Sequence, residues 1–178
     1  AGVAVLLGAV KAILDAGVEL PLDCHPLFTI SEEVGSGASA ILHGDIAEML
    51  TLDNGTTAPG QNSQEYGVTI CMADMSGPFD YHLTHRLLQI CQEFEIPHQR
   101  DVFRFYRSDS AAAVEAGNDL RTALATFGVD GSHGWERIHW NALESLAQLV
   151  ALYIQSPPLY ERDREPVSPL PGFSTMPG

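Results

Sequence analysis

Basic residues are scarce in this chain of 178 residues. Nine Lys and Arg residues stand against 23 Asp and Glu residues, which gives a formal net charge of −14, and Lys11 is the single lysine. A surface this acidic repels phosphate backbones and anionic lipids, so we expect no nucleic-acid partner and no membrane partner. The acidity fits a salt-rich cytoplasm, a cation-binding role or an ordinary solubility surface.

Long apolar runs and cysteine pairs are absent as well. No stretch approaches the ~20 apolar residues of a membrane-spanning helix, and the apolar opening segment lacks the basic start of a signal peptide. Cys24, Cys71 and Cys91 are widely spaced and form no CxxC pair. This spacing predicts free, buried thiols in a reducing compartment, so we expect a cytoplasmic protein.

Several catalytic signatures are also missing. The chain contains no GxSxG nucleophile elbow, no GxxxxGKS phosphate-binding loop and no HExxH zinc-binding helix. The Gly- and Ser-rich segment 35–40 opens a possible helix, but it lacks the third glycine of a dinucleotide-binding loop. These absences set aside the corresponding hydrolase, nucleotide-binding and metalloprotease classes.

Helical and strand patterns alternate along the chain. Four segments are expected to be helical, and they are 1–17, 82–95, 108–116 and 140–154. Short apolar runs predict four strands, at 27–30, 46–52, 68–72 and 102–106. The segment 120–127 fits a strand or a helix, because its alanines favour a helix and its position between two loops favours a strand. The alternation predicts an α/β layer sandwich.

Two adjacent acidic residues, Glu32 and Glu33, follow the predicted strand over 27–30. Burial would penalise both charges unless a positive group lay beside them, and a divalent metal ion meets that need. Adjacent side chains also diverge, so one carboxylate can bind a metal while the other reaches a bound water. A solvated pair at the end of a strand is the alternative interpretation.

Further candidate ligands are Asp53, Asp74 and His133. Each aspartate follows a predicted strand, where it serves either turn chemistry or a site. His133 lies among small residues shortly before the last predicted helix, which lets its imidazole point into a cleft and bind a metal. A capping or core role fits the same pattern, and His139 competes with His133 as a ligand.

The order of these motifs resembles a known family. Residues 28–35, Phe-Thr-Ile-Ser-Glu-Glu-Val-Gly, resemble the Glu-Glu-Val-Gly signature of dinuclear metalloaminopeptidases of the glutamyl (deblocking, tetrahedral-type, endoglucanase-like) aminopeptidase family. Other segments resemble family motifs in the family's order, and these are Leu52-Asp53 with Ala58-Pro59-Gly60, Ser76-Gly77-Pro78, Ile96-Pro97-His98-Gln99, and Ser132-His133 with Glu136. Ser108-Asp109-Ser110-Ala111 stands where the family usually has Gly-Thr-Asp-Ala. The joint order is more specific than any single motif.

The resemblance implies a fold, an activity and a role for each site residue. It implies a three-layer α/β sandwich of the zinc-exopeptidase type, in which a mixed sheet is flanked by helices. Glu32 would be the general base, Glu33 and His133 would hold one metal ion, and Asp53 would be a terminal ligand of the other. Two zinc or cobalt ions would activate a water that removes N-terminal residues from a peptide substrate. The intact protein would form a homo-oligomer.

The family also has parts that this chain lacks. Its first metal-binding histidine, its bridging aspartate and its inserted dimerisation domain all precede the segment that matches residue 1. We therefore expect residues 1–156 to be the C-terminal part of the catalytic domain, followed by a proline-rich tail over 157–178. On the same grounds we expect this chain to be inactive alone.

Two other functions fit the same residues. The first is a non-catalytic, peptidase-like interaction module that has lost its metal site. The second is an amidohydrolase or deacylase that acts on a small acylated peptide. Residues 132–139, Ser-His-Gly-Trp-Glu-Arg-Ile-His, resemble a subgroup linked to bacterial osmoprotectant systems, which favours the second of these.

Overall fold

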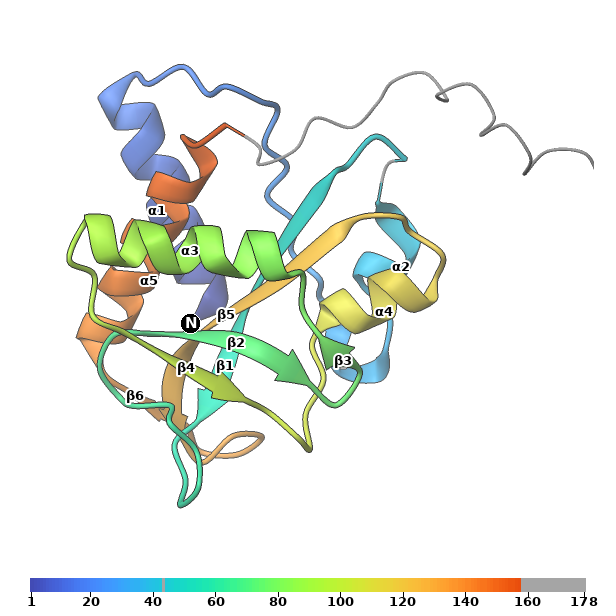
Figure 1. Ribbon diagram of the computed structural model, residues 1–178, viewed down its shortest axis with the longest axis vertical. Helices are drawn as coiled ribbons and strands as arrows, with labels where there is room; N and C mark the ends of the chain where they lie inside the picture. Colours follow the sequence, from blue (N-terminus) through green and yellow to red (C-terminus); the bar gives the residue numbers. More distant parts are fainter. Residues whose placement is uncertain (43, 158–178) are drawn as a thin grey trace, which may run out of the picture.

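The computed structural model describes residues 1–42 and 44–157 (Figure 1). Its elements follow in the order α1 (Gly2–Ala16), η1 (Glu32–Val34), α2 (Ala38–Ile41), β1 (Glu48–Thr56), β2 (Val68–Asp74), β3 (Gly77–Pro78), α3 (Tyr81–Glu93), β4 (His98–Val102), α4 (Asp109–Glu115), β5 (Arg121–Asp130), β6 (Arg137–Ile138) and α5 (Trp140–Ile154). The predicted tail over 157–178 lies, after residue 157, outside the described residues. Within the described ranges, no helix is long and apolar enough to cross a membrane.

All four predicted helices are confirmed, as α1, α3, α4 and α5. In α1 the buried residues Val5, Ala9 and Ile13 recur every four positions, which is the spacing of one helix face. Gly17 ends this helix in a left-handed conformation with φ 62°, where its N–H donates to the carbonyls of the last turn. Asp80 begins α3 by accepting the Leu83 N–H at 2.8 Å.

One mixed sheet joins the strands. β1 runs parallel to β5, β5 runs antiparallel to β2, and β4 lies parallel to β2 on its other side. The short β3 and β6 add antiparallel pairs to β2 and β5. The segment 120–127, for which helix and strand were both open, therefore belongs to the central strand β5. Its Ala123 and Ala125 are fully buried, because small side chains allow close packing over the middle of the sheet.

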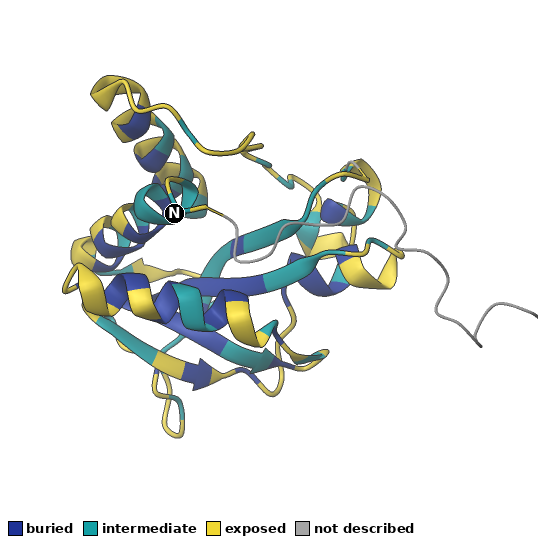
Figure 2. Ribbon diagram, turned by 45° about the horizontal axis from the view of Figure 1, so that its top comes forward, coloured by how far each residue is buried: buried dark blue, intermediate teal, exposed yellow. Residues whose placement is uncertain are grey.

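Helices cover both faces of the sheet, which confirms the three-layer sandwich. The main core lies between the sheet and α1, α3 and α5, and it includes Val5, Val68, Ile70, Leu87, Ala125 and Leu146. On β1, Leu50 and Leu52 pack against this core, so Thr51 points to the opposite face, where it hydrogen-bonds Ser110 of α4. Figure 2 shows the buried residues along the central strands and on the helix faces that meet them.

Two predicted strands are wrong in place or in kind. Residues 27–30 form an irregular loop in which Ile30 is 97% exposed, and the run 102–106 mostly follows β4, with Phe105 87% exposed. A short apolar run does not by itself distinguish a buried strand from a loop, because composition carries no information about strand pairing. The premise that Glu32 and Glu33 follow a buried strand is therefore also wrong.

β1 is longer than the sequence predicts. It continues through Asp53 to Thr56, because Gly55 and Thr56 still pair with Gly128 and Val129 of β5. A Cβ atom on Gly55 would meet the Thr126 hydroxyl at 2.4 Å, so only glycine permits this close pairing. Asp53 is consequently held inside a strand and does not close it.

The prediction of three free, buried thiols is confirmed for two of them. Cys71 and Cys91 are buried, and burial raises the pKa of each thiol to about 12. Cys24 is free but exposed, because it lies in the irregular connector that follows α1.

Truncation of the fully buried Leu146 to alanine is expected to destabilise the fold strongly. Leu146 of α5 is 0% exposed and sits in the main core, so the change removes buried methyl groups and leaves a cavity. The expected loss is about 2–5 kcal/mol in the free energy of unfolding, measured by chemical denaturation.

Leu14→Ala is the matched control, because Leu14 lies on α1 but is 74% exposed. We expect it to change the free energy of unfolding by less than about 0.5 kcal/mol. Equal losses for the two variants would contradict the assignment of the core.

Candidate functional site

Glu32 and Glu33 lie in η1, a single 3-10 turn within a loop. The turn closes because Gly35 adopts a left-handed φ of 79° and its N–H donates to the Glu32 carbonyl at 2.8 Å. Consecutive residues on a 3-10 helix diverge by about 120°, so the two carboxylates leave the turn in different directions. Glu32 is half-buried and Glu33 is exposed.

Asp53 approaches the same region from β1. It is half-buried, and its Oδ1 accepts the N–H of Asn54 at 2.7 Å. Asp53 shares its strand face with Thr51, because residues two apart on a strand point the same way. It therefore lies on the side of the sheet that α4 covers.

His133 enters the site from the loop between β5 and β6. Its Nε2 lies 3.5 Å from Oε2 of Glu33, and its ring centroid lies 6.4 Å from that of Tyr106. The backbone of His133 has a φ of 63°, which is uncommon for a non-glycine residue, and its N–H donates to Glu136 at 3.3 Å. This tight loop brings the imidazole to Glu33.

Electrostatic interactions link these residues into one cluster. The pKa of the Glu32 carboxyl is raised, mainly by burial and then by the negative charges of Asp53, Glu33 and Asp109. The pKa of Asp53 is also raised, mainly by burial and further by Glu33 and Asp109. His133 acts in the opposite direction on both groups. Four carboxylates and one imidazole thus share a common field.

The separation of Glu33 and His133 is compatible with a shared metal ion. Two ligand atoms about 2.0–2.1 Å from a tetrahedral zinc lie about 3.3 Å from each other. The measured 3.5 Å between Nε2 and Oε2 is close to that value. Among residues 1–42 and 44–157, no set of three or more His, Cys, Asp or Glu side chains converges closely enough to enclose a metal. Asp53 and Glu32 therefore lie near this pair without completing a cage around it.

Asp109 belongs to the cluster, although the sequence did not mark it as a site residue. It is the first residue of α4, it is 5% exposed, and both of its carboxylate oxygens accept the Ala38 N–H, at 3.1 and 3.2 Å. The available signal was its position in the Ser108–Ala111 motif, which departs from the usual family pattern.

The competing candidates lie elsewhere. His139 caps α5, where its Nδ1 accepts the Asn141 N–H at 3.2 Å and its ring packs on Tyr66 with centroids 4.4 Å apart. Asp74 is buried, and its carboxylate accepts hydrogen bonds from Ser76 and Ser108. Each therefore has a structural role that accounts for its position.

Comparison with known proteins identifies the relatives of the chain. Residues 1–149 match the model of a family described as M42 glutamyl aminopeptidase. A protein of Bacillus subtilis (strain 168) named "Putative aminopeptidase YhfE" is 37% identical over 157 residues, a match that covers 88% of this chain and 45% of that protein. The chain thus spans about half the length of the curated relative that it matches.

Solved structures share the fold at lower identity. A TET aminopeptidase from the marine sediment archaeon Thaumarchaeota archaeon SCGC AB-539-E09 matches with a TM-score of 0.71 at 20% identity, over 87% of this chain and 46% of the other. The Pyrococcus horikoshii TET1 peptidase matches with a TM-score of 0.69 at 21% identity, over 84% and 46%. These likenesses confirm a mixed sheet with flanking helices. With the family match over residues 1–149, they lead to one conclusion: this chain belongs to the M42 glutamyl aminopeptidase family.

Proposed function

We propose that the whole protein is a metal-dependent aminopeptidase that removes N-terminal residues from peptides. The observation that carries this proposal is the meeting of Glu32, Glu33, Asp53 and His133 at one place, in a chain that belongs to a family of aminopeptidases. These residues come from three separate segments of the fold. Residues 1–156 would form the C-terminal part of the catalytic domain.

The donor set fits divalent zinc or cobalt. Glu33 and His133 would hold one ion, and Asp53 would be a terminal ligand of a second. Carboxylate and imidazole groups are the ligands that such ions take in catalytic sites. Burial and, after it, neighbouring negative charges raise the pKa of Glu32 and Asp53, and a cation here would offset the second of these causes. When bound, the ions would acidify a water and polarise the scissile carbonyl.

Glu32 would then be the general base. One carboxylate oxygen of Glu32 takes a proton from the attacking water and returns it to the nitrogen of the leaving amine. Glu32 is half-buried next to the proposed ligand Glu33 in η1, which would place its carboxylate beside the water that the ions activate.

Assembly and location complete the proposal. The solved relatives include a dodecamer and a peptidase that can assemble into a tetrahedron or a large octahedral shell, which supports a homo-oligomer for the whole protein. The free thiols and the acidic surface support a cytoplasmic location.

Substitution of Glu32 separates catalysis from metal binding. Glu32→Gln keeps the size of the side chain but cannot accept a proton, so we expect kcat to fall by about 100- to 10,000-fold while the metal content stays unchanged. Glu33→Ala and His133→Ala each remove a proposed ligand and should lower the metal content. Release of amino acids from an unblocked peptide measures the first effect, and elemental analysis of the purified protein measures the second.

Glu115→Gln is the control, because it removes an exposed carboxylate from α4, away from the cluster. It should leave kcat and the metal content at the wild-type level. Normal turnover by Glu32→Gln would refute the base assignment. Unchanged metal content in Glu33→Ala and His133→Ala would refute the ligand assignment.

Asp53→Asn tests the cost of the Asp53 charge, which comes from burial first and from neighbouring carboxylates second, through the pH dependence of stability. Because the pKa of Asp53 is raised in the folded protein, the folded state holds a proton that the unfolded state releases at lower pH. Stability from this group is therefore complete below the unfolded pKa and is lost as pH rises through the folded pKa. Asn keeps an oxygen for the Asn54 N–H but carries no charge.

We expect the metal-free Asp53→Asn variant to gain stability over the wild type as pH rises through this window, and to show no gain below it. Denaturation of chelator-treated protein at a series of pH values measures the difference. Asp23→Asn, at an exposed position, should show no such trend. A variant that is destabilised increasingly as pH rises would show that the Asp53 charge stabilises the fold, and would contradict the raised pKa of Asp53.

A further inference from the structure

The start of α4 connects three parts of the fold, and one of them is the loop that carries Glu32 and Glu33. Three consecutive residues, Ser108, Asp109 and Ser110, are buried, with exposed fractions of 3%, 5% and 1%. Each bonds to a different part of the fold. Ser108 donates its N–H and hydroxyl to Asp74 at the end of β2, and Ser110 shares a hydrogen bond of 2.5 Å with Thr51 of β1.

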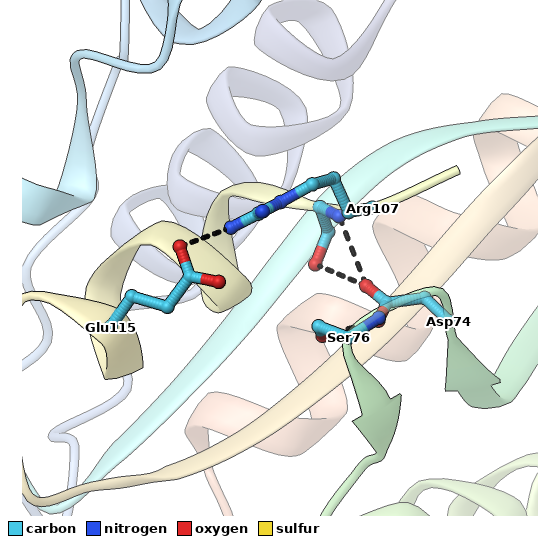
Figure 3. A network of polar contacts seen from close by, with 5 residues as sticks. Asp74, Ser76, Arg107 and Glu115 are labelled. Atoms are coloured by element: carbon cyan, nitrogen blue, oxygen red, sulfur yellow. Dashed lines mark hydrogen bonds and ion pairs between the residues drawn. The ribbon is translucent and has the colours of Figure 1, made fainter. Parts of the chain in front are cut away.

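Hydrogen bonds to Asp74 fix one end of this turn in space. Figure 3 shows Asp74 between Ser76 and the start of α4, and beside it the pair of Arg107 and Glu115, 2.5 Å apart. The Ser108 end is therefore anchored to β2, and the Ser110 end is anchored to β1. Asp109, between them, is presented from a rigid frame.

Asp109 in turn holds the segment that carries Glu32 and Glu33. Its two oxygens accept the N–H of Ala38, 71 residues earlier in the chain, and Ala38 is fully buried. The approach is so close that a Cβ on Gly37 would lie 2.7 Å from Oδ2 of Asp109. The loop over 29–38 is thus tied down just after the two glutamates.

Asp109 acts on this loop through a hydrogen bond and not through an ion pair. Asp109 is buried and adds negative charge beside Glu32 and Asp53, and none of the ion pairs found among residues 1–42 and 44–157 includes it. An amide of the same shape would supply the same acceptor oxygen to the Ala38 N–H, so the bond does not need the charge of Asp109.

We propose that Asp109 is a positioning residue, which sets the place of the catalytic glutamates through its bond to the Ala38 N–H. This role rests on the aminopeptidase function proposed above. Asp109 need not touch substrate or metal. It fixes the loop so that the Glu32 carboxylate stays within reach of the proton that it accepts from the attacking water.

The kinetic test compares Asp109→Ala with Asp109→Asn in the whole protein. Loss of the acceptor in Asp109→Ala should lower kcat by about 10- to 100-fold with KM changed less than about threefold, because a small displacement of a catalytic group is costly. Asp109→Asn keeps an acceptor oxygen and should recover most of that loss. The metal content should stay at the wild-type level in Asp109→Asn, and Glu115→Gln should behave as wild type.

Two kinetic results would overturn the proposal. If kcat falls as far in Asp109→Asn as in Asp109→Ala, the bond to Ala38 does not explain the effect of Asp109 on kcat. If the metal content falls in Asp109→Asn, which keeps the bond to Ala38, Asp109 is a ligand and not a positioning residue.

Hydrogen exchange of the Ala38 amide tests the same bond without any activity. The amide should exchange at least about tenfold faster in Asp109→Ala than in wild type and Asp109→Asn, since an unbonded amide is more easily opened. Gly37→Ala places a methyl group against the Asp109 carboxylate and should also speed exchange of the Ala38 amide. This variant provides the test if Asp109→Ala does not fold. Unchanged exchange overturns the proposal. If the Ala38 amide exchanges faster in Asp109→Ala as expected, but the wild-type protein is inactive on peptides, the aminopeptidase function is refuted and the role of the Asp109 bond is not.

Discussion

Repulsion between carboxylates is the constraint on which the arrangement of this protein depends. Glu32, Glu33, Asp53 and Asp109 come from three separate parts of the chain and share one field, in which burial and neighbouring charge raise the pKa of Glu32 and Asp53. Without a cation, the negative charges of these groups repel one another. The sheet holds Asp53 in a paired strand, and buried hydrogen bonds hold Asp109 at the start of α4. The fold thus maintains a concentration of negative charge that a divalent cation would neutralise.

The helices of this fold could be predicted from the sequence, because the spacing of apolar residues along a helix is a local pattern. The spacing of Val5, Ala9 and Ile13 defines a buried helix face, and the helices predicted on such patterns formed. The resemblance to the family's motif order, and not a local pattern, named Glu32, Glu33, Asp53 and His133 as site residues. The Nε2 of His133 does lie 3.5 Å from Glu33, whereas His139 caps a helix.

The remainder depended on long-range contacts that no local pattern encodes. Residues 27–30 looked like a strand because they are apolar, but no neighbouring strand pairs with them, so they form a loop. Asp53 looked like the end of a strand, but Gly55 allows the pairing with β5 to continue beyond it. Asp109 reaches Ala38 across 71 residues, and its role emerged only once the fold placed α4 over that loop.

The central claim is that this cluster binds metal in an aminopeptidase of the M42 family. The most direct measurement is a crystal structure of the whole protein grown with zinc, with anomalous scattering recorded at the zinc absorption edge. The account predicts anomalous peaks within bonding distance of the side chains of Glu33, His133 and Asp53. Zinc peaks confined to other parts of an active protein, with these three side chains bare, would contradict it.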